Sequence, residues 1–137
     1  MVEIFEGTWH DPEYDNFENF LKEIGIGMIQ RKFAKNLKDK VTFIVDGDKI
    51  TMNTENTFVK SSLSFILNEE FYQKTPDGRE YNSTFTFNDG KLFQVEKAIN
   101  NKDVPSTCTR YIESGNLKVI LNCRGVIATV VYKKLKN

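Results

Sequence analysis

Turn-forming residues recur every nine to fourteen residues from Lys40 onward, and this spacing constrains the fold more than any other feature of the chain. They lie at 46–48, 68–69, 76–78, 88–90, 100–105, 114–116 and 124–125, with a weaker break at 55–56. The stretches between them are rich in Val, Ile, Thr, Phe and Tyr, which is typical of strands. Because they leave no room for crossover helices, we predict that successive strands are antiparallel neighbours.

An opening strand over 6–14, which contains Trp9, brings the predicted number of strands to about ten. Such a meander must close or cover its edges, so we predict an all-β fold, a ten-stranded antiparallel up-and-down β-barrel of the β-clam type. Ten strands enclose more space than side chains fill in an eight-stranded barrel, which predicts an internal cavity. No linker rich in Pro, Gly or Ser interrupts the 137 residues, so we expect a single domain over 1–137.

Residues 15–37 are the segment with helical periodicity. Asp15 and Glu18 have the spacing of a capping box, and Gly25 should end the first helix. The first apolar face consists of Phe17, Phe20, Leu21 and Ile24. After Gly27, a second helix should carry an apolar face made of Ile29, Phe33 and Leu37. We predict that these two amphipathic helices form a helix-turn-helix lid between the first two strands.

The composition argues against several classes of function. With 19 basic and 19 acidic residues the formal net charge is zero, which disfavours a nucleic-acid partner and a membrane-stacking protein. The start of the chain has no basic region followed by a long apolar run, so we expect a soluble cytosolic protein. The one histidine is His10, and no nucleophile with a matching base is visible, so we do not expect an enzyme.

Cys108 and Cys123 are the two cysteines, and their spacing fits neither a disulfide framework nor a metal site. We therefore expect buried free thiols, no metal and no cofactor.

Short motifs along the whole chain resemble the intracellular lipid-binding proteins of the fatty-acid-binding group. The matching motifs, in order, are Gly7-Thr8-Trp9, Asn16-Phe17-Glu18-Asn19-Phe20-Leu21, Gly25-Ile26-Gly27, Asn56-Thr57-Phe58, Leu63-Ser64-Phe65, Glu69-Glu70-Phe71, Thr75-Pro76-Asp77-Gly78-Arg79 and Asp89-Gly90-Lys91-Leu92. The resemblance implies a ten-stranded barrel with a helical lid. It also implies a monomeric carrier that binds a long-chain fatty acid in the barrel and delivers it to membranes or receptors.

The resemblance implies an anion-binding group at Arg110, together with an Arg-x-Tyr near the C-terminus. Here the second element reads Val130-Val131-Tyr132, so the tyrosine is present and its arginine is absent. If 114–115 and 124–125 are two-residue turns, Arg110 faces Val119 and Val119 faces Val130. Arg110 and Tyr132 could then reach a common carboxylate, while Val130 adds apolar surface. A retinoid or another hydrophobic ligand with a non-carboxylate head group remains the alternative.

The resemblance also supplies candidate positions around the cavity. The cavity-lining positions of the family match Phe17, Leu21, Cys108, Val119 and Leu121. Phe58 matches the portal phenylalanine, and Pro76 and Asp77 lie in the other portal turn. The segment 100–105 is longer than the family's usual turn, and we expect it on the surface without bearing on the ligand. Glu96-Lys97-Ala98 stands where many vertebrate members have Gln-Lys-Trp, which suggests a modified cavity lining.

Basic residues gather at the end of the predicted lid. They are Arg31, Lys32, Lys35, Lys38 and Lys40, with Asp39 as the one acid among them. Each basic residue near an anionic membrane contributes about 1 kcal/mol, so transient membrane contact through the basic lid is expected, with a solvated helix face as the alternative. Lys22, Arg31 and Lys32 also match an import signal of some relatives, which implies a nuclear pool beside the cytoplasmic one.

Overall fold

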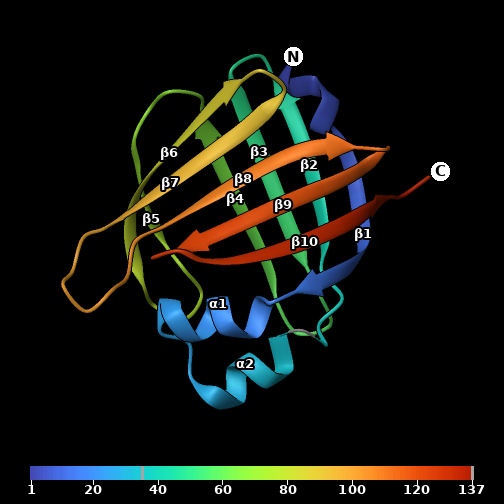
Figure 1. The fold of residues 1–137 in the computed structure, drawn as a ribbon. Coiled ribbons are helices and arrows are strands. Elements are labelled where there is room, and N and C mark those ends of the chain that lie inside the picture. Colours follow the sequence, from blue (N-terminus) through green and yellow to red (C-terminus); the bar gives the residue numbers. More distant parts are fainter. Residues whose placement is uncertain (35, 137) are drawn as a thin grey trace.

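The computed structural model describes residues 1–34 and 36–136, and these form one curled sheet with two helices at one end (Figure 1). A short 3-10 helix, η1 (Val2–Phe5), precedes the sheet. The strands are β1 (Gly7–Asp15), β2 (Lys40–Asp46), β3 (Lys49–Glu55), β4 (Lys60–Ile66), β5 (Phe71–Lys74), β6 (Glu80–Asn88), β7 (Lys91–Ala98), β8 (Ser106–Glu113), β9 (Asn116–Cys123) and β10 (Val126–Lys134). The helices α1 (Phe17–Ile24) and α2 (Met28–Ala34) lie between β1 and β2. The predicted fold class is confirmed.

The sheet is nearly closed. Neighbouring strands pair in the order β4-β3-β2-β1-β10-β9-β8-β7-β6-β5, so β1 joins strands β2–β4 to strands β5–β10 by pairing with both β2 and β10. Among the described residues, β4 and β5 share no ladder, and aromatic rings cover this gap instead. The rings of Phe65 and Phe85 stack with centroids 3.6 Å apart, and Phe71 lies 6.1 Å from each. Such stacking supplies apolar contact where backbone pairing is missing.

Two-residue turns fix the register of the last three strands. Ser114 and Gly115 both have positive φ, as do Arg124 and Gly125, which is the geometry that matches the twist of a tight hairpin. As a result Arg110 pairs with Val119, and Val119 pairs with Val130. The predicted register is confirmed.

Helix α1 is attached to the barrel through its apolar face. Phe20 and Ile24 are buried against Cys123 and Ala128 of β9 and β10, as the spacing predicts. Gly25 ends the helix with φ 101°, and the N–H of Ile26 donates to the carbonyl of Leu21 at 2.9 Å, which is a Schellman arrangement.

The predicted capping box at the start of α1 is wrong. Strand β1 continues through Asp15, and the N-cap is Asn16, which adopts the left-handed conformation with φ 59°. Asn16 caps no helical N–H, because its Oδ1 accepts from Asn19 Nδ2 at 2.7 Å and its Nδ2 donates to the Ile127 carbonyl at 2.7 Å. Asparagine tolerates this conformation better than most residues, so it suits a sharp strand-to-helix corner.

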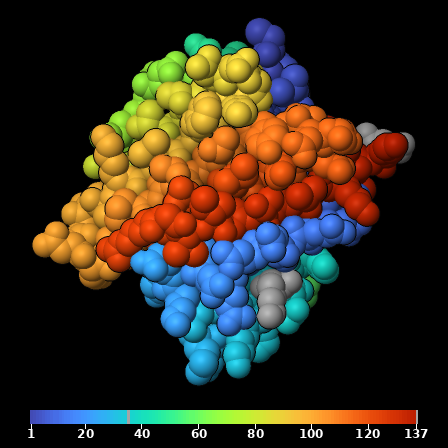
Figure 2. Space-filling view, viewed as in Figure 1, coloured from blue at the N-terminus to red at the C-terminus, as the bar shows by residue number. Residues whose placement is uncertain are grey.

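Helix α2 departs from the prediction because none of its residues is buried. Ile29 is 69% exposed and Phe33 63% exposed, and α2 ends at Ala34, so Leu37 lies beyond the helix. Helix α2 forms the tip of the molecule at the lid end (Figure 2). Lys35, predicted as part of the basic lid, lies outside the described residues. No helix in the described part of the chain is long and apolar enough to cross a membrane.

Candidate ligand-binding cavity

An internal cavity of about 180 Å³ lies inside the barrel, next to the lid. Its apolar lining includes Val41, Phe43, Met52 and Leu117 from the strands, and its polar lining consists of Tyr14, Asp39, Thr54, Arg110 and Tyr132. A larger hollow of about 410 Å³ lies over β3 and β4, but its lining residues are polar or charged. Ligand pockets are concave and mostly apolar with a few convergent polar groups, so the internal cavity is the better candidate.

The structure brings together the three residues predicted for a head-group site. Arg110, Val130 and Tyr132 all line the cavity, and Tyr132 lies two residues beyond Val130 on the same face of β10. The guanidinium of Arg110 lies over the ring of Phe85, 5.7 Å from its centroid. Its Nη1 donates to Gln94 Oε1 at 2.9 Å, while the other N–H groups of the fork make no bond among the described residues.

A chain of hydrogen bonds extends from Arg110 to an interior acid. Gln94 is buried, and its Nε2 donates to Glu96 Oε1 at 3.2 Å. Burial raises the pKa of the Glu96 carboxyl, and the positive charges of Arg110 and Arg79 lower it by less. Gln94 thus links the partly buried Arg110 to a poorly solvated acid through both ends of its amide.

Two tyrosines and Asp39 complete the polar lining. Tyr14 donates to the Leu37 carbonyl at 2.9 Å, whereas the Tyr132 hydroxyl makes no hydrogen bond with the described residues. Burial, followed by the negative charge of Asp39, raises the pKa of both phenols far above the usual value. Burial also raises the pKa of Asp39, against the opposing effect of a hydrogen bond from Asn56. Both phenols are therefore neutral donors at physiological pH.

The structure divides the five predicted cavity-lining residues into two groups. Phe17, Val119 and Leu121 line the cavity. Leu21 is not among the lining residues and packs against the cluster that contains Cys123 and Ala128. Cys108 is not among them either, and it lies in the main core with 3% of its surface exposed. Both cysteines are buried and free, as predicted.

Phe58 lies in the turn between β3 and β4, at the lid end of the barrel, and is 78% exposed. The side chain of Asn56 organises this turn, since its Oδ1 accepts from the N–H groups of Phe58 at 2.9 Å and Val59 at 3.0 Å. Its Nδ2 donates to Asp39 Oδ1 at 2.9 Å. The turn that carries Phe58 is therefore tied to the segment that follows α2.

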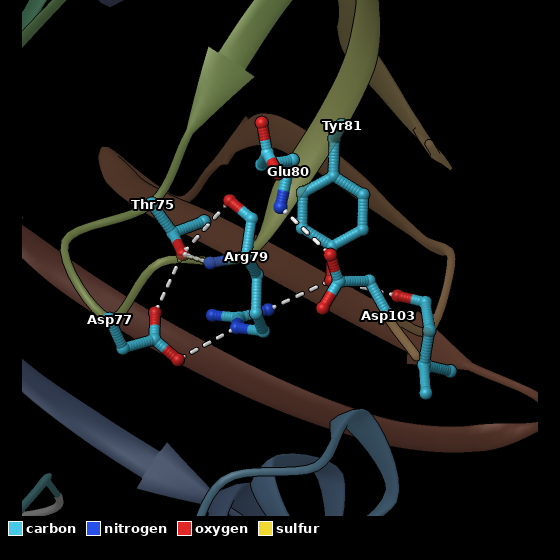
Figure 3. Close-up of polar contacts among 7 residues, drawn as sticks. Thr75, Asp77, Arg79, Glu80, Tyr81 and Asp103 are labelled. Atoms are coloured by element: carbon cyan, nitrogen blue, oxygen red, sulfur yellow. Dashed lines mark hydrogen bonds and ion pairs between the residues drawn. The ribbon is translucent and has the colours of Figure 1, made fainter. Parts of the chain in front are cut away.

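The second predicted portal turn carries Pro76 and Asp77, which are both exposed. Asp77 accepts from Arg79 Nε at 2.8 Å and from Thr75 Oγ1 at 2.7 Å (Figure 3). Burial alone would raise the pKa of Asp77, but the bonds from Arg79 and Thr75 outweigh it and lower the pKa. These contacts hold the turn in one shape.

The 100–105 segment is more than the surface loop that the sequence predicts. Asp103 is buried, and its Oδ2 accepts from the N–H of Glu80 at 3.0 Å (Figure 3). The Tyr81 hydroxyl accepts from Arg79 Nη1 at 3.0 Å and donates to the Val104 carbonyl at 2.9 Å. The longer loop thus fastens the β5–β6 turn to the wall of the barrel.

Sequence reasoning missed Gln94, Tyr14 and Asp39. The alternation Leu92-Gln94-Glu96 along β7 puts Gln94 on the inner face, and that signal could have identified it. Asp39 follows an irregular segment and carries no periodic signal, so its place in the cavity depends on how the lid closes over β2.

The described residues thus form a ten-stranded barrel with a two-helix lid and one arginine in the cavity lining. Residues 6–134 match the lipocalin / cytosolic fatty-acid binding protein family, and the chain belongs to it. It is 40% identical over 131 residues to fatty acid-binding protein homolog 5 of Caenorhabditis elegans, covering 96% of each chain.

Solved structures support the same assignment. Apo lipid binding protein 8 of Caenorhabditis elegans superposes with a TM-score of 0.93 at 32% identity, over 98% of each chain. A Schistosoma mansoni fatty acid binding protein in complex with arachidonic acid superposes with a TM-score of 0.89 at 33% identity, over 97% of each chain.

Proposed function

We propose that this protein is an intracellular carrier that binds a long-chain fatty acid inside its barrel and releases it at membranes or to a receptor. The observation that carries the proposal is the shared cavity of Arg110 and Tyr132, which offers donors to a carboxylate within an otherwise largely apolar lining. Charge-assisted bonds from a guanidinium fork suit a carboxylate better than any neutral head group. The family, and the fatty acids named for its relatives, support the same ligand class.

In the proposed complex the carboxylate binds Arg110, Tyr132 adds a hydrogen bond, and Val130 contacts the first carbons of the chain. A cavity of about 180 Å³ is smaller than the usual ligand pocket, so the distal chain must extend toward the lid. We propose that the ligand passes between α2 and the turns that carry Phe58 and Asp77. The absence of buried residues in α2 supports movement of that helix.

Delivery is proposed to occur through transient contact between the lid and an anionic membrane. Exposed apolar side chains on α2 and the nearby turn would insert, and exposed Lys32 and Lys38 would meet the headgroups. Arg31 contributes less to this surface, because it is only partly exposed and its Nη1 donates to the Ile26 carbonyl at 2.6 Å.

The carrier is proposed to act as a non-enzymatic monomer in the cytoplasm and, when loaded, in the nucleus. Lys22, Arg31 and Lys32 are the proposed import positions, and an unchanged nuclear fraction after neutralisation of all three would remove that part of the proposal.

A second candidate ligand is a retinoid or another lipid with a neutral head group. Val130 favours it, because this apolar side chain lies in the cavity beside Arg110 and Tyr132.

Native mass spectrometry of the purified protein, followed by titration with oleate, tests the proposal. We expect a bound fatty acid and an affinity that falls by about a hundredfold in Arg110→Ala, because a charge-assisted bidentate pair is lost. Tyr132→Phe should lower the affinity for oleate by less than Arg110→Ala does, since only one neutral donor is removed. Equal oleate affinity in all three proteins would favour the neutral-ligand alternative, and absence of any lipid binding would refute the carrier function.

A further inference from the structure

Asp39 is an acid that faces the same cavity as Arg110. It directly precedes β2 at the lid end, whereas Arg110 lies in the middle of β8. Asp39 Oδ1 accepts from Asn56 at 2.9 Å, and Oδ2 has no hydrogen bond or ion pair among the described residues. A ligand that reaches from Arg110 toward the lid would therefore run past a partly buried acceptor oxygen that is open to a donor from the ligand.

The cavity lining carries charges of both signs. Arg110 and Asp39 are the two charged groups in the lining. Glu96 is linked to Arg110 by the two hydrogen bonds of the Gln94 amide. Arg79, the other nearby arginine, is bonded to Asp77 at 2.8 Å. A bound fatty acid thus adds a negative charge to a lining in which Asp39 already offsets Arg110.

A methylene chain lying against Asp39 would remove water from the carboxylate without replacing its hydrogen bonds, which is unfavourable. A hydroxyl on the chain would replace that water with a charge-assisted bond to Oδ2. We infer that Asp39 is a specificity-determining residue that selects fatty acids bearing a hydroxyl group along the chain. The inference rests on the proposed function, with the ligand carboxylate at Arg110.

Stearate and a set of monohydroxylated stearates, which differ in the position of the hydroxyl, provide the test. We expect at least one hydroxystearate to bind the wild-type protein roughly tenfold more tightly than stearate does, the gain from one charged hydrogen bond. In Asp39→Asn the preference should disappear, because stearate gains affinity and the hydroxyl bond loses its charge. Asparagine keeps an Oδ1 acceptor for Asn56, so this variant preserves the tie to the β3–β4 turn.

Glu96→Gln is the matched control. It also removes one negative charge near Arg110, but Glu96 does not line the cavity, so both ligands should gain affinity with their ratio unchanged. The inference is overturned if stearate binds as tightly as every hydroxystearate, or if Asp39→Asn and Glu96→Gln change the ratio equally. Failure of all these lipids to bind the wild type would instead refute the proposed function.

Discussion

The barrel interior and helix α2 both reverse the usual distribution of polar and apolar side chains, but only the interior reversal is compensated. Inside, Arg110 and Glu96 are joined through the buried amide of Gln94. On α2, Ile29 and Phe33 face solvent without any cover from the described residues. We therefore expect the interior to stay ordered, and we expect the uncovered apolar side chains of α2 to make the transient membrane contact proposed above. Perturbing the interior should therefore alter stability and affinity, and perturbing α2 should alter delivery.

The largest effect is expected from breaking the interior chain at Gln94. Gln94→Leu leaves the Arg110 and Glu96 groups without their bridging amide, which should lower the free energy of unfolding by about 3 kcal/mol. Urea denaturation measures the change. Adding Arg110→Met and Glu96→Met should recover much of the loss, because apolar side chains leave no charged group without a partner there. If Gln94→Leu alone is as stable as wild type, the hydrogen bonds of Gln94 do not stabilise the charged groups of Arg110 and Glu96.

We expect a different outcome on α2, where the side chains are exposed. Phe33→Ser should change the free energy of unfolding by less than about 0.5 kcal/mol, because the side chain is already exposed. It should nevertheless slow the transfer of a fluorescent fatty acid to anionic vesicles severalfold, because less apolar surface can insert. Ile44→Ser, at an exposed apolar residue of β2, is the matched control. Equal transfer rates in the two variants would argue against a special role for α2.

The smallest effect concerns Glu96 and pH. Burial raises its pKa in the folded state above the usual value of 4.5, so the folded protein holds this proton more tightly than the unfolded chain does. The associated stability is fully present below pH 4.5 and is lost as the pH rises through the folded pKa. Glu96→Gln should therefore be more stable than wild type at neutral pH, with the advantage vanishing below pH 4.5.

Urea denaturation across this pH range measures the difference, with Glu69→Gln on the surface as a control for the loss of a charge. A constant difference between Glu96→Gln and wild type at every pH would contradict the assigned shift.

Regular spacing made most of the fold predictable. The turns at 114–115 and 124–125 set the register, because a two-residue turn permits one pairing. Arg110 therefore pairs with Val119, and Val119 pairs with Val130. The period of α1 identified its buried face for the same reason. The equally periodic face of α2 is exposed, since the pattern predicts amphipathicity but does not say what covers it.

Features that depend on tertiary contacts could not be predicted from the sequence. Asp39 reaches the cavity through an irregular segment, and Asp103 becomes buried because the 100–105 loop folds back against Glu80. Asn16 replaced Asp15 as the N-cap because β1 extends one residue further through its pairing with β10. Each depends on a neighbour far away in the sequence, so local propensity carries no information about it.

A crystal structure of the oleate complex would show whether the ligand carboxylate lies inside the barrel at Arg110. We expect the carboxylate within hydrogen-bonding distance of the Arg110 guanidinium and the Tyr132 hydroxyl, with the chain running past Asp39 toward α2. A carboxylate at the lid end, with the methyl terminus against Arg110, would contradict this expectation.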